Sequence, residues 1–313
     1  MIVAKCPTRI SLVGGSSDLD SFLQKNKKGA VISFPCNLNT YISIHENHRN
    51  DFIVDYSLHE KVDSVERIKN DIARVVLGKF LPKKYLTVGF NSDTFSVGSG
   101  LAASSSYMIS MIKAMSFYHK INMSDFDICK LALELERQFN PLTGQQDTYG
   151  CGMMDFKKIE FTLNNDPRFS YLPSDFFEGF DMHLIYTGNT RSSTSVLKSI
   201  NVNKVTDIVG LVDDMEKSIL AYDYDTFYKI LREGWKKKKA TSERILSDTS
   251  MVEIDSLLYS SSSVKAHKLC GAGGGGHFVI FTDKGSSLDF LGGLKKWTTG
   301  IGLSQQGLRA MTV

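Results

Sequence analysis

The chain has 313 residues, of which 42% are hydrophobic, and this is enough for two hydrophobic cores. Its 37 basic and 34 acidic residues leave a net charge of +3, which is too small and too dispersed to indicate a nucleic-acid partner. No apolar stretch approaches the roughly 18 residues of a membrane helix, and the N-terminus lacks the apolar core of a signal peptide. The five cysteines are widely spread and form no C-x-x-C pair. We therefore expect reduced thiols in a cytoplasmic protein.

The first half of the chain is expected to combine strands with helices. Apolar runs typical of strands lie at residues 10–13, 30–34, 40–44, 52–56, 85–90 and 156–163. Helical spacing predicts helices over 65–80, 107–118 and 124–139, the last with Ser124 as its N-cap. The Pro and Gly at 141 and 144 end this third helix.

A polar, turn-rich stretch at 164–167 places a domain boundary near residue 175, which gives domains 1–175 and 176–313. Beyond it the pattern predicts strands at 182–186, 278–281 and 307–313, and helices at 195–200, 207–221, 225–235, 255–268 and 288–297. The basic run at 236–239 is interpreted as a solvated helix face, and the serines at 260–263 as a helix kink or an exposed turn. The whole pattern predicts an α+β fold with antiparallel sheets backed by helices.

The Gly- and Ser-rich segment 97–106 lies between a predicted strand and a predicted helix. Small residues before a helix N-terminus suit the binding of a phosphate, although a tight turn, a serine N-cap and a flexible linker are alternatives. It is no P-loop, because no lysine occurs between Lys84 and Lys113. Gly98-x-Gly100-x-x-Ala103 fits the dinucleotide fingerprint, but the second strand with its acidic end, which that fold requires, is missing.

Three segments together resemble, in the same order, the three motifs of the GHMP small-molecule kinases. They are 6–19 (CPTRISLVGGSSDL), 97–106 (VGSGLAASSS) and 268–281 (KLCGAGGGGHFVIF). The family motifs are P-x-R/K followed by a glycine pair or Gly-Glu, then G-L-G-S-S, then G-A-G-G-G. The resemblance implies an N-terminal domain like domain 2 of ribosomal protein S5 and a ferredoxin-like C-terminal domain. It also implies ATP and Mg²⁺ as cofactors, with nucleotide and acceptor bound between the domains.

The resemblance assigns ATP binding to the second motif, at Gly98, Ser99, Gly100, Leu101, Ala102, Ala103, Ser104 and Ser105. Ser104 takes the position whose hydroxyl meets Mg²⁺ in the family. The second ligand is expected to be Glu136, because it precedes Asp147 by 11 residues and because Glu134 faces another side of the same helix. Ala102 and Ala103 depart from the usual Gly-Ser, which removes one hydroxyl and requires either a negative φ or strain at Ala102.

The segment 143–150 (TGQQDTYG) resembles the family's G-x-Q-D-x-Y-G, which gives Asp147 the role of general base or of orienting group for the acceptor hydroxyl. A turn-forming carboxylate is the alternative. Arg9 aligns with the basic residue of the first motif, where a cation would stabilise the charge of the reacting groups. The expected acceptor-binding residues are Arg9, Gly15, Ser16, Ser17, Asp18, Thr187, Gly188, Arg191, Gly273 and Gly274.

Two of these segments have further interpretations. Asp18 can accept hydrogen bonds from sugar hydroxyls or cap a helix at 19–24. The glycines at 271–276 precede a strand, so they are expected to allow close approach of their backbone to the second-motif loop or to the substrate; a flexible linker is the alternative.

The R-I-S-x-x-G-G-x-x-D text at 9–18 and Y-T-G-x-x-R-x-S at 186–193 look like the branch containing heptose 7-phosphate kinase and related sugar 1-kinases. This implies ATP-dependent phosphorylation of the C1 hydroxyl of D-glycero-D-manno-heptose 7-phosphate, with Arg191 binding the 7-phosphate. The 1,7-bisphosphate would supply nucleotide-activated heptose for capsule or lipopolysaccharide. One alternative is a kinase for fucose or an N-acetylhexosamine. The other is a non-catalytic sugar- or nucleotide-binding regulator, and the Ala102-Ala103 departure from the motif is the only sequence feature that supports it.

Overall fold

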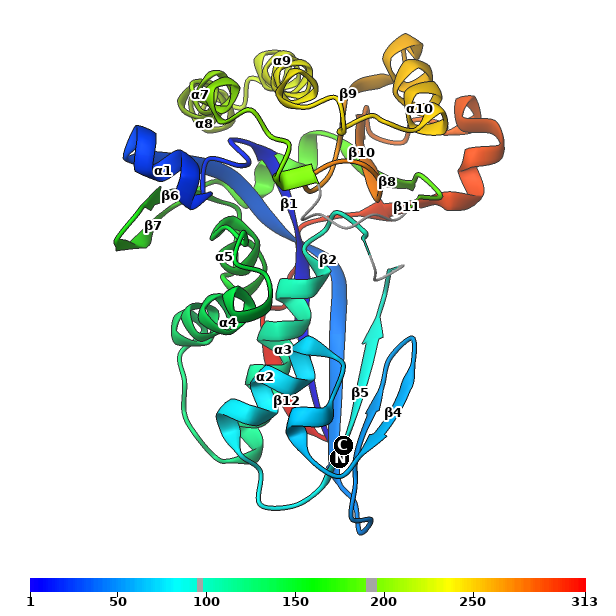
Figure 1. The fold of residues 1–313 in the computed structure, drawn as a ribbon. Helices are drawn as coiled ribbons and strands as arrows, with labels where there is room; N and C mark the ends of the chain where they lie inside the picture. Colours follow the sequence, from blue (N-terminus) through cyan, green and yellow to red (C-terminus); the bar gives the residue numbers. More distant parts are fainter. Residues whose placement is uncertain (95–97, 190–195) are drawn as a thin grey trace.

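The computed structural model describes residues 1–94, 98–189 and 196–313. Two antiparallel-rich sheets lie one above the other in Figure 1, and helices cover one side of each. The expected α+β class is therefore confirmed. Within the described ranges no helix is both long enough and apolar enough to span a bilayer.

The first sheet has eight strands and is organised around two long ones. Its main order is β12-β1-β2-β5-β3-β4, and β6 and β7 extend it beside β2. The strands are β1 (Ile2–Val13), β2 (Lys28–Glu46), β3 (Phe52–Asp55), β4 (His59–Val62), β5 (Leu86–Ser92), β6 (Lys157–Thr162), β7 (Asn165–Tyr171) and β12 (Arg309–Thr312). β1 and β2 pair antiparallel over nearly their whole length and run from the lower to the upper part of the molecule (Figure 1).

Helices pack against this sheet and enclose its core. They are α1 (Asp20–Asn26), α2 (Asp71–Phe80), α3 (Ala103–Tyr118), α4 (Asp125–Phe139) and α5 (Gln146–Gly152), with a short 3₁₀ turn, η1 (Val65–Arg67). α3 is buried along almost all of its length, which explains why its sequence shows no polar face. Ser124 caps α4 by accepting a hydrogen bond from the Asp127 amide, as expected.

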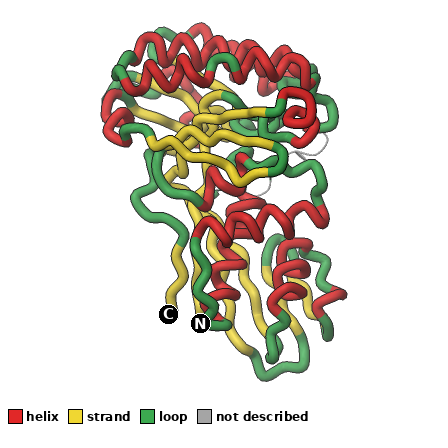
Figure 2. The backbone as a smooth tube through the Cα atoms, turned by 90° about the vertical axis from the view of Figure 1, so that its left-hand side faces the viewer, coloured by secondary structure: helices red, strands yellow, loops and turns green. Residues whose placement is uncertain are grey.

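The second sheet has the order β11-β8-β10-β9. Its strands are β8 (Asp181–Tyr186), β9 (Val264–Leu269), β10 (His277–Thr282) and β11 (Thr298–Ile301). The helices of this half are η2 (Ser174–Gly179), α7 (Val202–Val209), α8 (Val212–Leu220), α9 (Tyr224–Thr241), α10 (Thr249–Ser260) and η3 (Asp289–Trp297). Most of them form the row of helices at the top of Figure 2.

The last strand, β12, returns to the first sheet and pairs with β1. This brings the two termini together: the Val313 amide donates to the Met1 carbonyl at 2.9 Å. Apart from this strand, the two sheets lie on opposite sides of residue 175 in the sequence. We keep the boundary between domains 1–175 and 176–313 as a proposal.

Several predicted elements are wrong in extent or type. The helix expected at 65–80 begins only at Asp71, because the Glu60 carboxylate accepts hydrogen bonds from the amides of Lys69 and Asn70 and holds that segment extended. The helix expected at 207–221 is two helices, α7 and α8. The helix expected at 255–268 ends at Ser260, and the serine run is the turn that leads into β9.

Three further differences concern regions near the site or the C-terminus. Asp147, for which a turn-forming role was the alternative, lies in helix α5, and the polar stretch at 164–167 is the hairpin of β6 and β7. The helix at 288–297 is a 3₁₀ segment broken at Gly292, where φ is 52°. The helix predicted at 195–200 begins on residues outside the described ranges. All five cysteines are free and buried, as expected for reduced thiols.

Candidate active site

A cavity of about 470 Å³ lies where the two halves meet. The residues that line it come from β1, the loop after it, the start of α3, α4, α5, α9 and β9. Its charged lining residues among those described are Arg9, Asp18, Glu136, Asp147, Lys238 and Lys268. Residues far apart in the sequence therefore meet in one cleft.

The second-motif loop turns sharply into α3 at one wall of this cavity. Gly98 and Gly100 have φ values of 68° and 76°, which glycine adopts without strain. α3 begins at Ala103, so Ser104 and Ser105 belong to its first turn rather than to the loop. Amides of a first helical turn lack carbonyl partners within the helix and favour anions. This geometry suits a phosphate group.

Ala102 caps the start of α3 in a left-handed conformation, with φ 61° and ψ 36°. An L-residue pays about 1–2 kcal/mol for this conformation, whereas glycine does not. Of the two outcomes open for this position, a negative φ or strain, the structure has strain. It also explains why a glycine at this position suits the motif.

The third-motif glycines form the hairpin loop between β9 and β10 and pack directly on the second-motif loop. A Cβ atom on Gly276 would lie 2.5 Å from the Ser99 carbonyl oxygen, and one on Gly271 would lie 2.7 Å from the Gly100 Cα. The expected close approach of two backbones is thus observed. His277, which follows the glycines, is buried and donates from Nδ1 to the Ser99 carbonyl at 2.9 Å. Sequence reasoning missed this contact, which fixes the loop.

Glu136 extends from α4 to the first turn of α3. Ser105 Oγ donates to its Oε2 at 2.7 Å, and Ser104 Oγ donates to its Oε1 at 3.2 Å. Its side chain is buried, and burial raises the pKa of this carboxyl to about 7. Glu134 is exposed on the other side of the helix, so only Glu136 lines the cavity.

A serine hydroxyl beside a carboxylate is a set of hard oxygen donors that suits Mg²⁺, an ion that keeps its remaining sites for phosphates and water. Within the described ranges no cluster of three or more His, Cys, Asp or Glu residues could hold a metal by itself. The residues present therefore fit a Mg²⁺ bound together with a nucleotide, rather than a closed metal site of the protein alone.

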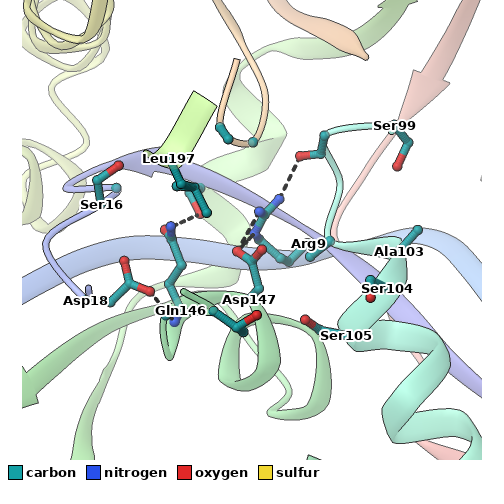
Figure 3. Close-up of a pocket in the computed structure, with 18 of the residues that line it drawn as sticks. Arg9, Ser16, Asp18, Ser99, Ala103, Ser104, Ser105, Gln146, Asp147 and Leu197 are labelled. Atoms are coloured by element: carbon teal, nitrogen blue, oxygen red, sulfur yellow. Dashed lines mark hydrogen bonds and ion pairs between the residues drawn. The ribbon is translucent and has the colours of Figure 1, made fainter. Parts of the chain in front are cut away.

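Arg9 and Asp147 form an ion pair at the centre of the cavity (Figure 3). Both guanidinium bonds to the carboxylate, from Nη2 at 2.6 Å and from Nε at 3.0 Å, end on Oδ1. Arg9 is 2% exposed and also donates from Nη1 to the Gly100 carbonyl at 2.9 Å, whereas the Asp147 side chain is 34% exposed. The pair thus joins the phosphate loop to a carboxylate whose second oxygen, Oδ2, carries neither bond.

Asp18 lies on the side of Asp147 away from Ser104 and Ser105 (Figure 3), and it is almost completely buried. Its Oδ2 accepts a hydrogen bond from the Gln146 amide at 2.9 Å, and Oδ1 has no partner among the described residues. Burial raises the pKa of Asp18 to about 6. It does not cap α1, whose N-cap is Leu19, so the helix-cap alternative is wrong.

Some expected contact residues lie away from the cavity. Ser17 is buried, and its hydroxyl donates to the carbonyls of Gly14 and Ala30. The hydroxyl therefore stabilises its own turn and does not face the cavity. Leu101 packs in the core. Thr187, Gly188, Gly273 and Gly274 are also absent from the cavity wall: Thr187 Oγ1 donates to the Gly276 carbonyl, and the Gly274 amide donates to Ile245. Gly271 and Ala272 line the cavity in place of the later glycines. Arg191 lies outside the described residues.

The other expected residues do line the cavity. They are Arg9, Gly15, Ser16, Asp18, Gly98, Ser99, Gly100, Ala102, Ala103, Ser104, Ser105, Glu136 and Asp147. One end of the cavity was missed: Tyr56, Asn70, Ile72, Phe90 and Tyr107 line it with mostly apolar surface near the start of α3. These residues carry no common motif, since only the fold brings them together from three elements and two loops.

Two lysines from the second half also line the cavity and were missed. Lys268 donates from Nζ to the carbonyls of Ser11 at 2.6 Å and Leu12 at 2.9 Å, and so joins β9 to β1. Lys238 belongs to the basic run that we interpreted as a solvated face. That interpretation is wrong for this residue, because α9 turns it toward the cleft, where it donates to the Gly271 carbonyl.

Comparisons with known proteins agree with this fold. Residues 68–154, which contain the second motif, Glu136 and Asp147, match the family described as "GHMP kinases N terminal domain". These residues therefore match a GHMP kinase N-terminal domain, and relatives that align with most of the chain are named as kinases.

Individual relatives cover almost the whole chain. It is 25% identical to a "D-glycero-alpha-D-manno-heptose 7-phosphate kinase" of Campylobacter jejuni, over 94% of this chain and 93% of the relative. It is 22% identical to a "Galactokinase" of Thermotoga maritima, over 90% and 89%. Its fold is similar to the crystal structure of a "D-glycero-D-manno-heptose 1-phosphate kinase" of Bacteroides thetaiotaomicron, with a TM-score of 0.79, 19% identity, and coverage of 100% and 99%.

Proposed function

We propose that this protein transfers the γ-phosphoryl group of ATP to the C1 hydroxyl of D-glycero-D-manno-heptose 7-phosphate and so forms the 1,7-bisphosphate. The observation that carries the proposal is the arrangement of Asp147 between the phosphate-binding start of α3 and the buried, partly unpartnered carboxylate of Asp18. The Campylobacter relative, whose name gives the same acceptor, supports the choice of sugar.

The reacting hydroxyl is placed by Asp147. Its Oδ2 accepts the hydrogen bond of the C1 hydroxyl and takes up the proton as the new P–O bond forms and the bond to ADP breaks. Arg9 holds Oδ1, which fixes the direction of the carboxylate, and its positive charge stabilises the acceptor oxygen and the transferred phosphoryl. Asp18 accepts from another sugar hydroxyl through Oδ1, for which the described residues supply no donor.

The nucleotide occupies the other part of the cavity. The first turn of α3 and the glycine loop donate amides to the phosphates, and the adenine lies on the apolar end formed by Ile72, Phe90 and Tyr107. Ser104 and Glu136 would hold Mg²⁺, which when bound neutralises charge on the β- and γ-phosphates. The product would enter the synthesis of nucleotide-activated heptose for surface polysaccharide, in the cytoplasm.

An acceptor panel tests the proposal. ADP formation is measured with the heptose 7-phosphate, the heptose 1-phosphate, galactose, fucose and an N-acetylhexosamine, and ³¹P NMR locates the new phosphate. The highest kcat/KM is expected for the 7-phosphate, with a new signal at C1. Preference for another acceptor would assign a different sugar kinase of this superfamily, and ATP binding without turnover of any acceptor would indicate the non-catalytic regulator.

Arg191 remains a prediction for the 7-phosphate. If it binds that group, Arg191→Ala weakens binding of the phosphorylated acceptor by about 1.5–3 kcal/mol, the range for a hydrogen bond to a charged group. Steady-state kinetics with the unphosphorylated heptose are the control, because a contact that this sugar cannot make cannot be lost.

A further inference from the structure

Lys238 is the member of the 236–239 run that points into the cleft. It lies on α9, is largely buried, and its Nζ donates to the carbonyls of Gly271 and, at 3.4 Å, Leu269. Gly271 packs against Gly100, whose carbonyl accepts from Arg9. The Lys238 ammonium is therefore connected to the centre of the site through two backbone contacts.

The partners of Lys238 differ from those of the lysines beside it. Lys237 pairs with Glu233 at 3.4 Å, and Lys239 pairs with Asp255 at 2.6 Å. Among the residues that the structure describes, Lys238 forms no ion pair with a carboxylate, and its two acceptors are neutral carbonyls. An ammonium group has three protons to donate, so these two carbonyls leave one N–H for which the described residues supply no acceptor.

The surroundings of this ammonium oppose its charge. Burial, and to a smaller extent the positive charge of the neighbouring Lys268, lowers the pKa of Lys238 to about 7. The titratable or charged groups that act on it from other elements are Lys268, Cys270, Arg9 and Asp147. A buried cation next to other cations is stabilised when an anion binds between them.

We propose that Lys238 binds a phosphoryl group of the substrates, as the contribution of the C-terminal half to the phosphate-binding machinery. The proposal deepens the function proposed above and rests on it. Phosphate reaches this wall of the cavity from two sources, the γ-phosphate of ATP and the phosphate already on the acceptor. Both present the same anionic oxygens, and the test separates them.

The test compares Lys238→Met with Lys236→Met, which removes an exposed ammonium from the same helix. Both are measured against the wild type with MgATP and two acceptors, the phosphorylated sugar and its unphosphorylated form. Lys238→Met is expected to lower kcat/KM by about 10- to 100-fold, as for the loss of a charge-assisted hydrogen bond, whereas Lys236→Met leaves it unchanged. A loss confined to the phosphorylated acceptor would show that Lys238 binds the acceptor phosphate. An equal loss of kcat with both acceptors would show that it binds the γ-phosphate of ATP.

A purely structural role, in which Lys238 only holds Gly271, is distinguished by pH. In the wild type kcat/KM falls above the pKa of the free ammonium, and this limb should disappear in Lys238→Met. Lys238→Gln, which keeps a donor for Gly271, should show the same loss while its thermal unfolding stays near that of the wild type. Unchanged kinetics in Lys238→Met would overturn the proposal. So would a loss of kcat/KM that is equal at every pH and is absent in Lys238→Gln.

The outcome does not depend on which sugar is correct. If the acceptor panel selects a sugar other than heptose 7-phosphate, the same variants are measured with that sugar and with its phosphorylated form. An effect of Lys238→Met there supports phosphate binding although the heptose assignment has failed. Turnover of heptose 7-phosphate that is insensitive to Lys238→Met leaves the proposed function intact and refutes only the role of this lysine.

Discussion

The pKa of Glu136 makes Mg²⁺ binding depend on pH in a predictable direction. The carboxyl is buried against the start of α3, and burial raises its pKa to about 7. A metal ion binds the ionised form, so a proton competes with Mg²⁺ below this value. The ionised fraction of Glu136 is about one tenth at pH 6 and about nine tenths at pH 8. Mg²⁺ should therefore bind about tenfold more tightly at pH 8 than at pH 6.

This prediction is measured with a fluorescent ADP analogue, whose Mg²⁺-dependent binding is titrated at several pH values between 6 and 8. Glu136→Gln should bind Mg²⁺ weakly and lose the pH dependence, while Glu134→Gln, which removes an exposed carboxylate two residues away, should match the wild type. Titration of the nucleotide itself is common to all three proteins and cancels in the comparison. An identical pH dependence in Glu136→Gln would show that this carboxylate does not hold the metal.

Three other variants test separate parts of the structure. Asp147→Asn should keep nucleotide affinity and lower kcat by about 10²–10⁴, and near-normal turnover would remove Asp147 from the mechanism. Ala102→Gly should relieve left-handed strain of about 1–2 kcal/mol, against a cost of about 0.4–1 kcal/mol in the unfolded chain, so urea unfolding should show a gain of up to about 1.5 kcal/mol in the free energy of unfolding. A decrease there would mean that the Ala102 methyl packs more favourably than the strain costs. Asp255 accepts hydrogen bonds from His267, Lys239 and Trp235, which outweigh burial and lower its pKa to about 2. This is worth about 2 kcal/mol of stability that is present above pH 4 and is lost as the pH falls toward 2, and Asp255→Asn should abolish that dependence in acid unfolding curves.

Local sequence signals predicted those elements whose ends or faces are marked in the chain itself. Ser124 and the three-residue spacing to Asp127 mark the start of α4, and α4 is confirmed to within a residue. Segment 255–268 carries apolar residues at helical spacing, yet its second part is β9. This strand is defined by pairing with β10 across the glycine loop, and no local pattern reveals a hairpin partner.

The site divides in the same way. Arg9, Ser104 and Asp147 belong to motifs, Glu136 was selected by its spacing to Asp147, and the fold brings all four to one cavity. Ser17 lies within a motif as well, but its hydroxyl is used by its own turn, a use that the sequence does not distinguish from substrate binding.

Four charged groups of the cavity share a feature that only the folded chain reveals. Burial raises the pKa values of Asp18 to about 6 and of Glu136 to about 7, and it lowers those of Lys238 to about 7 and of Lys268 to about 8. Acids and bases are thus shifted in opposite directions toward neutrality, as expected where both kinds of charge lose water. Under the proposed function a metal ion would favour the ionised form of Glu136, and a phosphoryl group would favour the protonated form of Lys238. Binding of both should then release a proton at Glu136 and take one up at Lys238, so the net proton exchange measured by calorimetry in two buffers should be small in the wild type. It should become a net release in Lys238→Met and a net uptake in Glu136→Gln, and unchanged exchange in both variants would refute this coupling.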